Sequence, residues 1–423
     1  MRKRPEKIAV VGLGYVGLPL AVALAEKFSV VGFDIDKTRI KDLQGGHDWT
    51  NEISDDEMAK STLRVSDEPD IMEGVDVFII TTPTPIDKNN QPDLSPVVSA
   101  SRSAAPYLSK GAVVVLESTV YPGVTEEVCG PALEEGSGLK AGKDFFLGYS
   151  PERINPGDRE HTISSIPKVI AGQTPEVTEL LANMYGAVTA GVFKAASIKT
   201  AEAAKVIENA QRDINIAFIN EAALIFNQSG ISIYDVLEAA GTKWNFLNFK
   251  PGLVGGHCIG VDPHYLAYFA ERGRVDPEMI LAGRKINESM VAYIGGKVSR
   301  KLKMGDRVLA LGLTFKENVP DLRNSKAVDI IKGLQGASFK VDVHDAEADP
   351  EEVKREYGLD LVSALEPVGE KYDCVLGIVA HTSYATMTVD DFRGILKPGG
   401  LIADVKGQWR DLHLEGEFER WTL

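Results

Sequence analysis

The sequence predicts an α/β protein with two Rossmann-like, doubly wound domains joined by a long central helix and a helical domain. Two observations support this prediction. At both ends of the chain, short runs of β-branched and aliphatic residues alternate with helical patterns, which is typical of parallel sheets covered by helices. Between these parts the pattern changes to long helical stretches. With 423 residues, the chain is long enough for two or three domains.

The first third of the chain contains short apolar runs that we expect to form buried strands. They are Ile8–Val11, Val30–Phe33, Val75–Thr81, Val113–Glu117, Phe145–Tyr149 and Val169–Ala171. Because helical patterns separate these runs, the strands should lie parallel in one sheet. Residues 1–197 are therefore predicted to form the first domain.

The middle of the chain is expected to be helical. The stretch Ile198–Ser229 is rich in Ala, Ile, Glu and Lys, and it stops at Gly230, a residue common after helix C-termini. Further helices at Ile233–Ala240 and Pro277–Leu302 complete a predicted central domain, residues 198–303. A helix as long as the first one often forms a dimer interface, although a buried helix within a monomer would have the same pattern.

From Arg307 the alternation of strands and helices returns. The expected strands are Val308–Gly312, Lys340–His344, Cys374–Val379 and Leu401–Val405. Residues 304–423 are therefore predicted to form a second, shorter α/β domain. It repeats the order strand, glycine, helix, strand and aspartate of the first domain but lacks the full glycine fingerprint. Two α/β domains on either side of a helical middle would form a cleft between them.

Composition excludes several classes of protein. A formal net charge of −15 argues against a nucleic-acid binder, since phosphate recognition depends on Lys and Arg. No segment reaches the roughly 18 apolar residues of a membrane span, so no membrane association is expected. Three cysteines, Cys129, Cys258 and Cys374, have no metal-like spacing, so neither a metal site nor a disulfide framework is indicated. We expect a cytoplasmic protein.

A glycine-rich turn follows the first strand. The residues Gly12-Leu13-Gly14-Tyr15-Val16-Gly17 lead directly into a helical segment, which is the context that a dinucleotide fingerprint requires. Gly12 permits the tight turn, Gly14 lets the backbone approach a pyrophosphate, and Gly17 lets helix and strand pack closely. The sequence thus predicts a dinucleotide site at the N-terminus of the first helix.

The residue after the second strand indicates which dinucleotide binds. Asp34 stands where a carboxylate would accept hydrogen bonds from both ribose hydroxyls. A carboxylate in that position disfavours a 2′-phosphate, so NAD is predicted rather than NADP. Lys37 and Arg39, which could attract a 2′-phosphate, are a reservation to this choice.

One cysteine lies in a glycine-dense segment, Pro251–Pro263, where the backbone can approach a substrate closely. This is Cys258. A structural cysteine more often lies in an apolar run, as Cys374 does. By itself the pattern leaves open whether Cys258 is reactive or structural. The neighbouring His257 is more often a structural residue, and Asp262, which precedes a proline, is more often a turn residue.

Three polar residues share one face of the long central helix, namely Glu202, Lys205 and Asn209. The pattern alone favours a solvated Glu–Lys pair. The alternative is a cationic and amide face that stabilises an oxyanion. Similarly, Glu152 follows a strand at the sheet edge where ligands bind, and it is either a base or a salt-bridge partner.

Taken together, these segments resemble the UDP-glucose/GDP-mannose dehydrogenase family along essentially the whole chain. The segments that carry the resemblance are Gly12–Pro19, Thr82–Pro85, Glu117–Gly123, Tyr149–Gly157, Ala201–Asn209, Pro251–Pro263 and Gly312–Ser325. The motifs SPERINPG and VGGHCIGVDP are similar to the branch that oxidises UDP-N-acetylglucosamine or UDP-N-acetylgalactosamine at C6 for capsule and O-antigen synthesis. UDP-glucose oxidation is the nearest alternative.

The resemblance implies a four-electron oxidation of the C6 alcohol to a carboxylate, with two NAD molecules used in turn. Cys258 would hold the aldehyde as a thiohemiacetal, a second hydride loss would give a thioester, and water would hydrolyse it. Lys205 and Asn209 would stabilise negative charge at C6.

The resemblance also implies roles for further residues. Asp262 would position a base water, and Glu152 and Thr119 would hold the hydrolytic water. The implied NAD contacts are Gly12, Gly14, Tyr15, Val16, Gly17, Asp34, Thr82, Pro83, Thr119 and Arg323. The implied contacts of the UDP-N-acetylhexosamine are Glu152, Arg153, Ile154, Asn155, Lys205, Asn209, Phe249, Gly252, Gly255 and Lys316.

Two other functions remain as alternatives. A two-electron hydroxyacid-type dehydrogenase would share the glycine turn and the long helix, but it would not need Cys258. A catalytically silent sugar-nucleotide-binding regulator would not need Cys258, Lys205 and Glu152 together. The C4 epimer of the substrate stays open, with N-acetylglucosamine preferred over N-acetylgalactosamine. A homodimer or higher homo-oligomer is expected through Ile198–Ser229.

Overall fold

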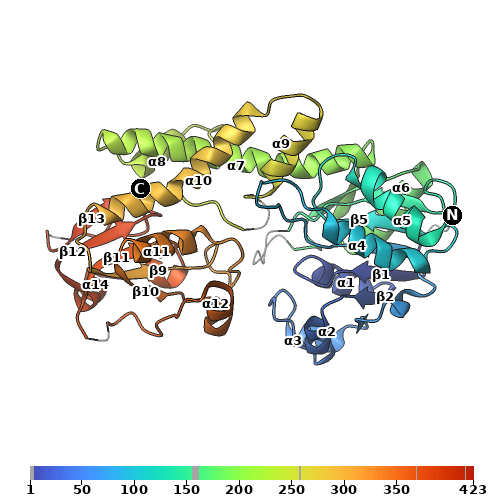
Figure 1. Ribbon diagram of the computed structural model, residues 1–423, viewed down its shortest axis with the longest axis horizontal. Coiled ribbons are helices and arrows are strands. Elements are labelled where there is room, and N and C mark those ends of the chain that lie inside the picture. The colour runs from blue at the N-terminus through green and yellow to red at the C-terminus, as the bar shows by residue number, and fades with distance from the viewer. Residues whose placement is uncertain (1–3, 155–161, 257–258, 368, 415) are drawn as a thin grey trace. The chain divides into compact units, whose positions relative to one another are not determined.

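The computed structural model describes residues 4–154, 162–256, 259–367, 369–414 and 416–423. The chain forms two compact units, each with its own sheet (Figure 1). The first comprises Met1–Glu208 and His264–Asp276, and the second comprises Asn209–Pro263 and Pro277–Leu423. The described residues contain no helix with the length and apolar character needed to cross a bilayer.

The first unit is built on a sheet whose described strands are ordered β3-β2-β1-β4-β5-β6-β7-β8. Neighbouring strands are parallel, except that β6 and β7 are antiparallel. The first six strands follow the order typical of dinucleotide-binding sheets, with a switch point between β1 and β4. The strands are β1 (Lys7–Val11), β2 (Ser29–Phe33), β3 (Arg64–Ser66), β4 (Val77–Ile80), β5 (Val113–Leu116), β6 (Phe146–Tyr149), β7 (Pro167–Gly172) and β8 (Gly191–Lys194).

Helices cover both faces of this sheet. Ile8 and Val10 of β1 pack in one core with residues of α1 and α6. Ala9 between them is also fully buried, so the opposite face is covered too. The helices are α1 (Gly17–Ala25), α2 (Lys37–Gln44), α3 (Asp55–Lys60), α4 (Ser95–Ala104), α5 (Gly130–Ser137) and α6 (Pro175–Tyr185), with short helical turns η1 (Pro69–Met72), η2 (Ala105–Tyr107) and η3 (Thr125–Cys129).

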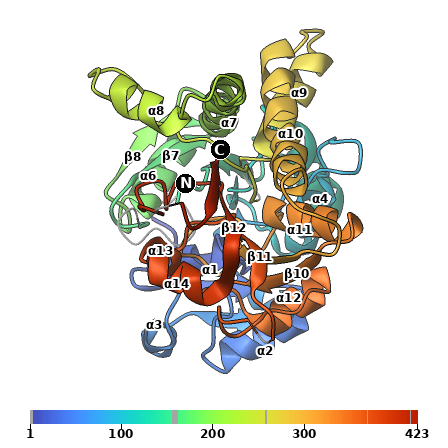
Figure 2. The same cartoon turned by 90° about the vertical axis from the view of Figure 1, so that its left-hand side faces the viewer.

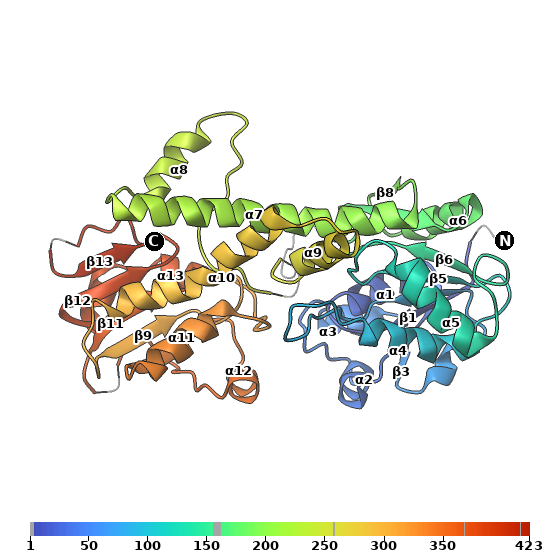
Figure 3. The same ribbon diagram turned by 45° about the horizontal axis from the view of Figure 1, so that its top comes forward.

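The described residues in the middle of the chain form four helices. They are α7 (Ile198–Gln228), α8 (Ile233–Gly241), α9 (Asp262–Arg272) and α10 (Glu278–Ser299). The long helix predicted from Ile198 is confirmed and ends one residue before the predicted end, while α10 is shorter at both ends than predicted. Figure 3 shows α7 as a single uninterrupted helix, and the division between the two units falls inside it.

The second unit is built on a parallel sheet with the order β10-β9-β11-β12-β13 among its described strands. Figure 2 shows α11 and α12 on one side of this sheet and α13 and α14 on the other. The elements are β9 (Arg307–Leu311), α11 (Lys326–Gly336), β10 (Lys340–His344), α12 (Pro350–Tyr357), β11 (Tyr372–Gly377), α13 (Thr382–Ala385), α14 (Val389–Ile395), β12 (Leu396–Asp404) and β13 (Glu419–Thr422). The predicted fold class, two doubly wound α/β sheets with a helical middle, is thus confirmed.

Candidate functional site

The glycine turn after β1 leaves room for a ligand at the N-terminus of α1. Gly12 has a φ of +97°, a conformation that favours glycine. A Cβ atom on Gly17 would lie 1.8 Å from the Gly12 carbonyl oxygen, so helix and turn could not pack with a larger residue. A Cβ atom on Gly14 would meet no other atom within 4 Å. The backbone of Gly14 therefore faces open space, and the turn fits a pyrophosphate.

Asp34 follows β2 and lies beside this turn. Its Oδ2 atom accepts a hydrogen bond from the N–H of Leu13 at 2.7 Å, and its Oδ1 atom accepts one from the N–H of Asp36 at 2.9 Å. An ionised carboxylate has about four acceptor positions. Asp34 thus braces the glycine turn and keeps acceptor capacity for ribose hydroxyls. Asp36 itself caps α2 by accepting from the N–H groups of Thr38 and Arg39.

The guanidinium group of Arg39 contacts residues of the first unit. Its Nε atom donates to the Leu13 carbonyl at 2.8 Å, and an Nη atom pairs with Asp48 at 2.8 Å. The group also lies 4.9 Å from the ring centroid of Trp49. Arg39 is buried. The reservation that this arginine would attract a 2′-phosphate therefore loses its support, and the described residues fit NAD better than NADP.

Other predicted cofactor residues lie at the carboxyl ends of β4 and β5. The hydroxyl of Ser118 donates to the carbonyl of Thr82 at 2.6 Å and ties the two strand ends together, next to Thr119. The hydroxyl of Thr82 has no hydrogen-bond partner among the described residues. Near the glycine turn, Tyr15 packs edge-on against Trp49 with ring centroids 5.8 Å apart. Pro83 is exposed, and Val16 precedes α1.

Glu152 belongs to a buried group of charged residues that we call the Lys168 cluster: Glu117, Glu152, Lys168 and Tyr185. The Lys168 ammonium donates to Oε2 of Glu117 at 2.8 Å and to Oε2 of Glu152 at 3.0 Å. It also donates to the Pro151 carbonyl at 3.3 Å. The Tyr185 hydroxyl donates to the other oxygen of Glu117. Glu152 is thus a salt-bridge partner, one of its two predicted roles, but its partner Lys168 could not be identified from the sequence.

The two carboxylates of the Lys168 cluster have opposite pKa shifts. Burial raises the pKa of Glu152, but the Lys168 ammonium and hydrogen bonds from the N–H groups of Ile154 and Arg153 outweigh burial and lower it. For Glu117, burial is the stronger effect and raises the pKa. Glu152 is thus the member that the surroundings keep ionised.

The remaining predicted substrate residues of this loop are only partly described. Arg153 pairs with Glu208 of α7 at 2.9 Å, and it also donates to the Pro167 carbonyl at 3.4 Å. Ile154 is partly buried. Asn155 lies outside the described residues.

On α7 the interpretation of a solvated Glu–Lys pair is wrong, because both residues are buried. Glu202 accepts hydrogen bonds from the N–H groups of Gly123 and Thr125 and from the Thr125 hydroxyl. Burial raises the pKa of Glu202 to about 7. Glu202 therefore fixes the loop after β5. Lys205 is 8% exposed and forms no ion pair with any residue of the described ranges.

One helical turn beyond Lys205, the amide of Asn209 donates to Oδ2 of Asp262 at 2.5 Å. Both side chains are buried. Asp262 is the first residue of α9, a helix that sequence analysis did not predict, and Pro263 follows it at a position where helices accept proline. The prediction that Asp262 is a simple turn residue is therefore wrong.

The segment before Cys258 is anchored to α7. Asn220 donates to the Gly252 carbonyl at 3.0 Å and accepts from the Gly252 N–H at 2.8 Å. Asn220 is itself held by Asn287, whose Oδ1 atom accepts from its amide at 2.8 Å. No local sequence signal predicts these hydrogen bonds of Asn220. A Cβ atom on Gly255 would lie 2.8 Å from the Asn324 carbonyl oxygen, so the backbone is tightly packed there.

Phe249, a predicted substrate residue, packs against the core of the second unit. Cys258 and His257 lie outside the described residues. The two described cysteines, Cys129 and Cys374, are buried and form no disulfide. Burial raises the pKa of Cys129 to about 11 and also raises the pKa of Cys374. Both are therefore neutral thiols at pH 7 and poor nucleophiles.

The second sheet repeats the turn of the first. Gly312 after β9 has a φ of +92°, and the N–H of Leu313 donates to Oδ2 of Asp345 at the end of β10. These three residues correspond to Gly12, Leu13 and Asp34. Asp345, however, also accepts from the N–H groups of Thr314, Glu347 and Ala348. Its carboxylate is saturated by the protein itself.

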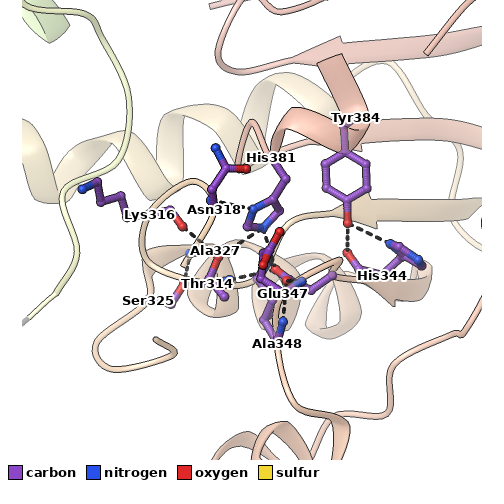
Figure 4. A network of polar contacts seen from close by, with 12 residues as sticks. Thr314, Lys316, Asn318, Ser325, Ala327, His344, Glu347, Ala348, His381 and Tyr384 are labelled. Atoms are coloured by element: carbon purple, nitrogen blue, oxygen red, sulfur yellow. Dashed lines mark hydrogen bonds and ion pairs between the residues drawn. The ribbon is translucent and has the colours of Figure 1, made fainter. Parts of the chain in front are cut away.

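His381 completes this arrangement (Figure 4). Its Nδ1 atom accepts from the N–H of Asn318 at 2.9 Å, so the ring proton sits on Nε2, which lies 3.2 Å from Oδ2 of Asp345. The hydroxyl of Thr314 donates to the Lys316 carbonyl at 3.0 Å. The turn that carries Lys316 is thus held from both sides.

A pocket lies at the carboxyl ends of β9 and β11, the switch point of this sheet, where ligands of such sheets bind. Its lining includes Gly255, Ser325 and Lys406. Lys406 pairs with Glu317 at 2.9 Å, and sequence analysis missed it. Arg323, a predicted NAD contact, pairs with Asp321 in this same unit. No group of three or more His, Cys, Asp or Glu in the described part of the chain could hold a metal ion.

Comparison with known families divides the chain into three consecutive matches. All three models belong to the UDP-glucose/GDP-mannose dehydrogenase family. The NAD binding domain matches residues 6–189, the central domain residues 199–289 and the UDP binding domain residues 309–411.

Individual proteins are similar over nearly their full lengths. The Staphylococcus aureus protein CapL is 52% identical over 423 residues, which cover 98% of this chain and 99% of that protein. The UDP-N-acetyl-D-glucosamine 6-dehydrogenase of Pseudomonas aeruginosa is 52% identical over 408 residues, covering 95% of this chain and 96% of that enzyme. The solved structure of the UDP-D-ManNAc dehydrogenase from Pyrococcus horikoshii aligns with a TM-score of 0.88 at 30% identity, covering 98% of both chains.

Proposed function

Because the chain belongs to the UDP-glucose/GDP-mannose dehydrogenase family, we propose that it is an NAD-dependent UDP-N-acetyl-D-glucosamine 6-dehydrogenase. The choice of substrate rests on the similarity to the Pseudomonas aeruginosa enzyme, which is 52% identical over 95% of this chain and 96% of that enzyme. The product would be a UDP-linked N-acetylhexosaminuronic acid for capsule or O-antigen polysaccharide. The enzyme would act in the cytoplasm, where a reactive thiol stays reduced.

In this proposal each of three domains has its own role. Residues 1–197 bind NAD, residues 198–303 form the central domain with the cysteine segment, and residues 304–423 bind the UDP half of the substrate. The positions of the family matches support this division. The pocket beside Lys406 and the braced turn of Lys316 support a nucleotide site in the third domain.

NAD supplies the hydride acceptor for both oxidation steps. The open backbone at Gly14 and the N-terminus of α1 would receive its pyrophosphate, and Asp34 would accept hydrogen bonds from a ribose. Thr82 and Thr119, at the ends of β4 and β5, would contribute further contacts. Arg323 is a further proposed NAD contact.

Cys258 is the proposed nucleophile. A thiolate at this position would add to the C6 aldehyde and hold the half-oxidised carbon until the second hydride has left. The buried, neutral state of Cys129 and Cys374 supports this choice. Lys205, buried and without an ion-pair partner among the described residues, would stabilise the oxyanion together with Asn209.

Two waters take part in the proposed reaction, one as a base and one as the nucleophile that hydrolyses the thioester. Asp262 is proposed to position a base water, and its hydrogen bond with Asn209 supports a fixed orientation. Glu152, ionised beside Lys168, and Thr119 would hold the water that attacks the thioester.

A homodimer through α7 remains a proposal. Phe218 and Ile225 are seven positions apart on this helix, and their exposed fractions are 63% and 58%. Ile207, which is 60% exposed, lies eleven positions before Phe218. These spacings place the three side chains on one stripe of the helix, as in helix pairs that bury such a seam. A second copy of the chain would cover it.

The NADH yield at completion tests the proposal. Limiting UDP-N-acetylglucosamine, UDP-N-acetylgalactosamine and UDP-glucose are each incubated with excess NAD and either wild type or Cys258→Ala. With wild type we expect two NADH per UDP-N-acetylglucosamine. With the variant we expect no formation of the uronic acid product. Cys374→Ala is the matched control, because that thiol is buried in β11.

Each other outcome identifies an alternative. One NADH per sugar, with no effect of the Cys258 substitution, would indicate a two-electron dehydrogenase. Two NADH from UDP-glucose or UDP-N-acetylgalactosamine alone would change the substrate but keep the mechanism. Tight binding of the sugar nucleotide without any NADH would indicate a catalytically silent protein.

A further inference from the structure

The Lys168 cluster has no role in the chemistry described so far except through Glu152. Lys168 lies on β7, Glu117 follows β5, and Tyr185 ends α6, so three elements of the first unit meet at this point. The side chain of Lys168 is 6% exposed and that of Glu117 fully buried. Burying four ionisable groups is costly unless they are paired, so the cluster calls for a function.

We propose that Lys168 is a positioning residue for thioester hydrolysis, which holds the carboxylate of Glu152 ionised and in one orientation. This inference rests on the proposed function, because it assigns Glu152 to the hydrolytic water.

The hydrogen bonds around Lys168 fix its ammonium group. A lysine has three donors, and all three are used, by Glu117, Glu152 and the Pro151 carbonyl. The second oxygen of Glu152 accepts from the N–H groups of Arg153 and Ile154 at 2.6 and 2.8 Å. Glu152 is therefore held at both oxygens, so its carboxylate cannot rotate.

The charges around Glu152 make Lys168 decisive for its ionisation. Arg153 is paired with Glu208, so its charge is largely compensated. Glu117 is an acid, and Tyr185 donates to Glu117 rather than to Glu152. Without Lys168, two carboxylates would share a buried site with no cation between them. The pKa of Glu152, which Lys168 lowers against the effect of burial, would then rise.

The hydrolytic step shows why ionisation matters. The oxygen of water forms a bond to the thioester carbon, the bond from that carbon to the Cys258 sulfur breaks, and the sulfur leaves as a thiolate. The proton lost by the water goes to the carboxylate of Glu152. A protonated Glu152 cannot accept that proton, so the thioester would persist while both preceding hydride transfers remain possible.

The test compares Lys168→Met with Lys168→Arg in the full-length enzyme. The matched control is Lys194→Met, since Lys194 on the neighbouring strand β8 is exposed and pairs only with Glu179 in the described part of the chain. Rapid mixing with NAD and UDP-N-acetylglucosamine measures NADH formed in the first turnover, and steady-state kcat is measured across pH.

We expect kcat of Lys168→Met to fall about 100-fold at pH 7, the usual size of a lost general base. The variant should still release a burst of two NADH per active site, and the acidic limb of its kcat profile should move to higher pH. Lys168→Arg, which keeps the cation, should recover most of kcat. Lys194→Met should match wild type.

Glu117→Gln provides a second test that does not remove the lysine. It takes away the carboxylate that competes for Lys168, so the acidic limb should move to lower pH, opposite to Lys168→Met. If Lys168→Met fails to fold, the proposal is tested by Glu117→Gln alone. An acidic limb of its kcat profile at the wild-type pH would then refute the proposal.

The inference and the proposed function can fail separately. If wild type gives two NADH per sugar but Lys168→Met lacks the burst, or keeps the wild-type pH limb, Lys168 is only structural. If wild type itself gives no second NADH, the thioester mechanism is wrong, and the role of Lys168 falls with it.

Discussion

Asn209 donates its side-chain amide to Asp262 at 2.5 Å, although 53 positions separate them in the sequence. The bond joins α7 to the first residue of α9, and both side chains are buried. An amide held in this way presents a fixed direction to any ligand beside it. The two residues therefore act as one unit in the proposed mechanism.

We expect Asn209→Ala to lower kcat by about 100- to 1000-fold, the range for the loss of one oxyanion donor. Asp262→Asn should have a similar effect. The double variant should be little worse than the more damaged single variant, because partners in one network are not additive. A double-mutant cycle on kcat/KM measures this. Asn215→Ala, which loses only a bond to the Gln211 carbonyl, is the control. Fully additive losses would mean that the two residues act independently.

Asp34→Ala should raise KM for NAD by at least about tenfold, because a typical lost hydrogen bond to a charged group is worth about 1.5 to 3 kcal/mol. It removes both the ribose acceptor and the brace of the Leu13 N–H. NADP should not become a better substrate, since Arg39 is already paired with Asp48. Initial rates at varied NAD and NADP check this. Asp36→Ala, which removes only the cap of α2, should leave KM for NAD near the wild-type value. A gain of NADP activity would contradict the assignment of Arg39.

Acid should destabilise the second unit through Asp345. Burial raises the pKa of Asp345, but the hydrogen bonds from His381 and from backbone N–H groups outweigh burial and lower it from 3.8 to about 2. The stabilisation is present above about pH 4 and is lost as pH falls towards 2, because the folded carboxylate takes up its proton later than the unfolded one. The shift corresponds to about 2 kcal/mol.

Urea unfolding at pH values from 5 to 2 measures this contribution. Asp345→Asn should be less stable than wild type at pH 5, and the difference should shrink as pH falls. Asp360→Asn is the control, because Asp360 is exposed and forms a surface ion pair with Lys354. A difference that stays constant with pH would show that the charge of Asp345 does not matter.

Phe218→Glu should convert a dimer into a monomer if α7 forms the interface. A charge placed in the middle of an apolar seam loses burial and gains a desolvation cost. Light scattering at micromolar concentration gives the mass. Met304→Glu, at an exposed position outside the four central helices, is the control and should not change the mass. A monomeric wild type would exclude the proposed dimer.

Signals that lie close together in the sequence predicted the nucleotide-binding turn. Gly12, Gly14 and Gly17 follow one strand directly, and Asp34 follows the next, so local pattern and fold agree. The conformations of the turn and the packing at Gly17 match those expectations. The role of these residues in binding NAD stays a prediction.

Partners that are distant in sequence could not be predicted. Lys168 is 51 positions from Glu117, and Asn220 is 32 positions from Gly252. Each is an ordinary strand or helix residue until the fold brings its partner near. Glu202 was misread for the same reason, since its partners lie on a loop 77 and more positions away. The helix α9 was missed because a glycine-rich segment leads directly into it.

The saturated carboxylate of Asp345 has a consequence for the order of events in catalysis. The described residues contain two turns of the same geometry, but only Asp34 keeps acceptor capacity for a ribose. Two NAD molecules would then have to bind at the same site, one after the other, while one sugar nucleotide stays bound. In the proposed mechanism, NADH would then be exchanged for NAD in the middle of the reaction, while the sugar is bound covalently to the protein. At high NADH this exchange, rather than the chemistry, would limit the rate.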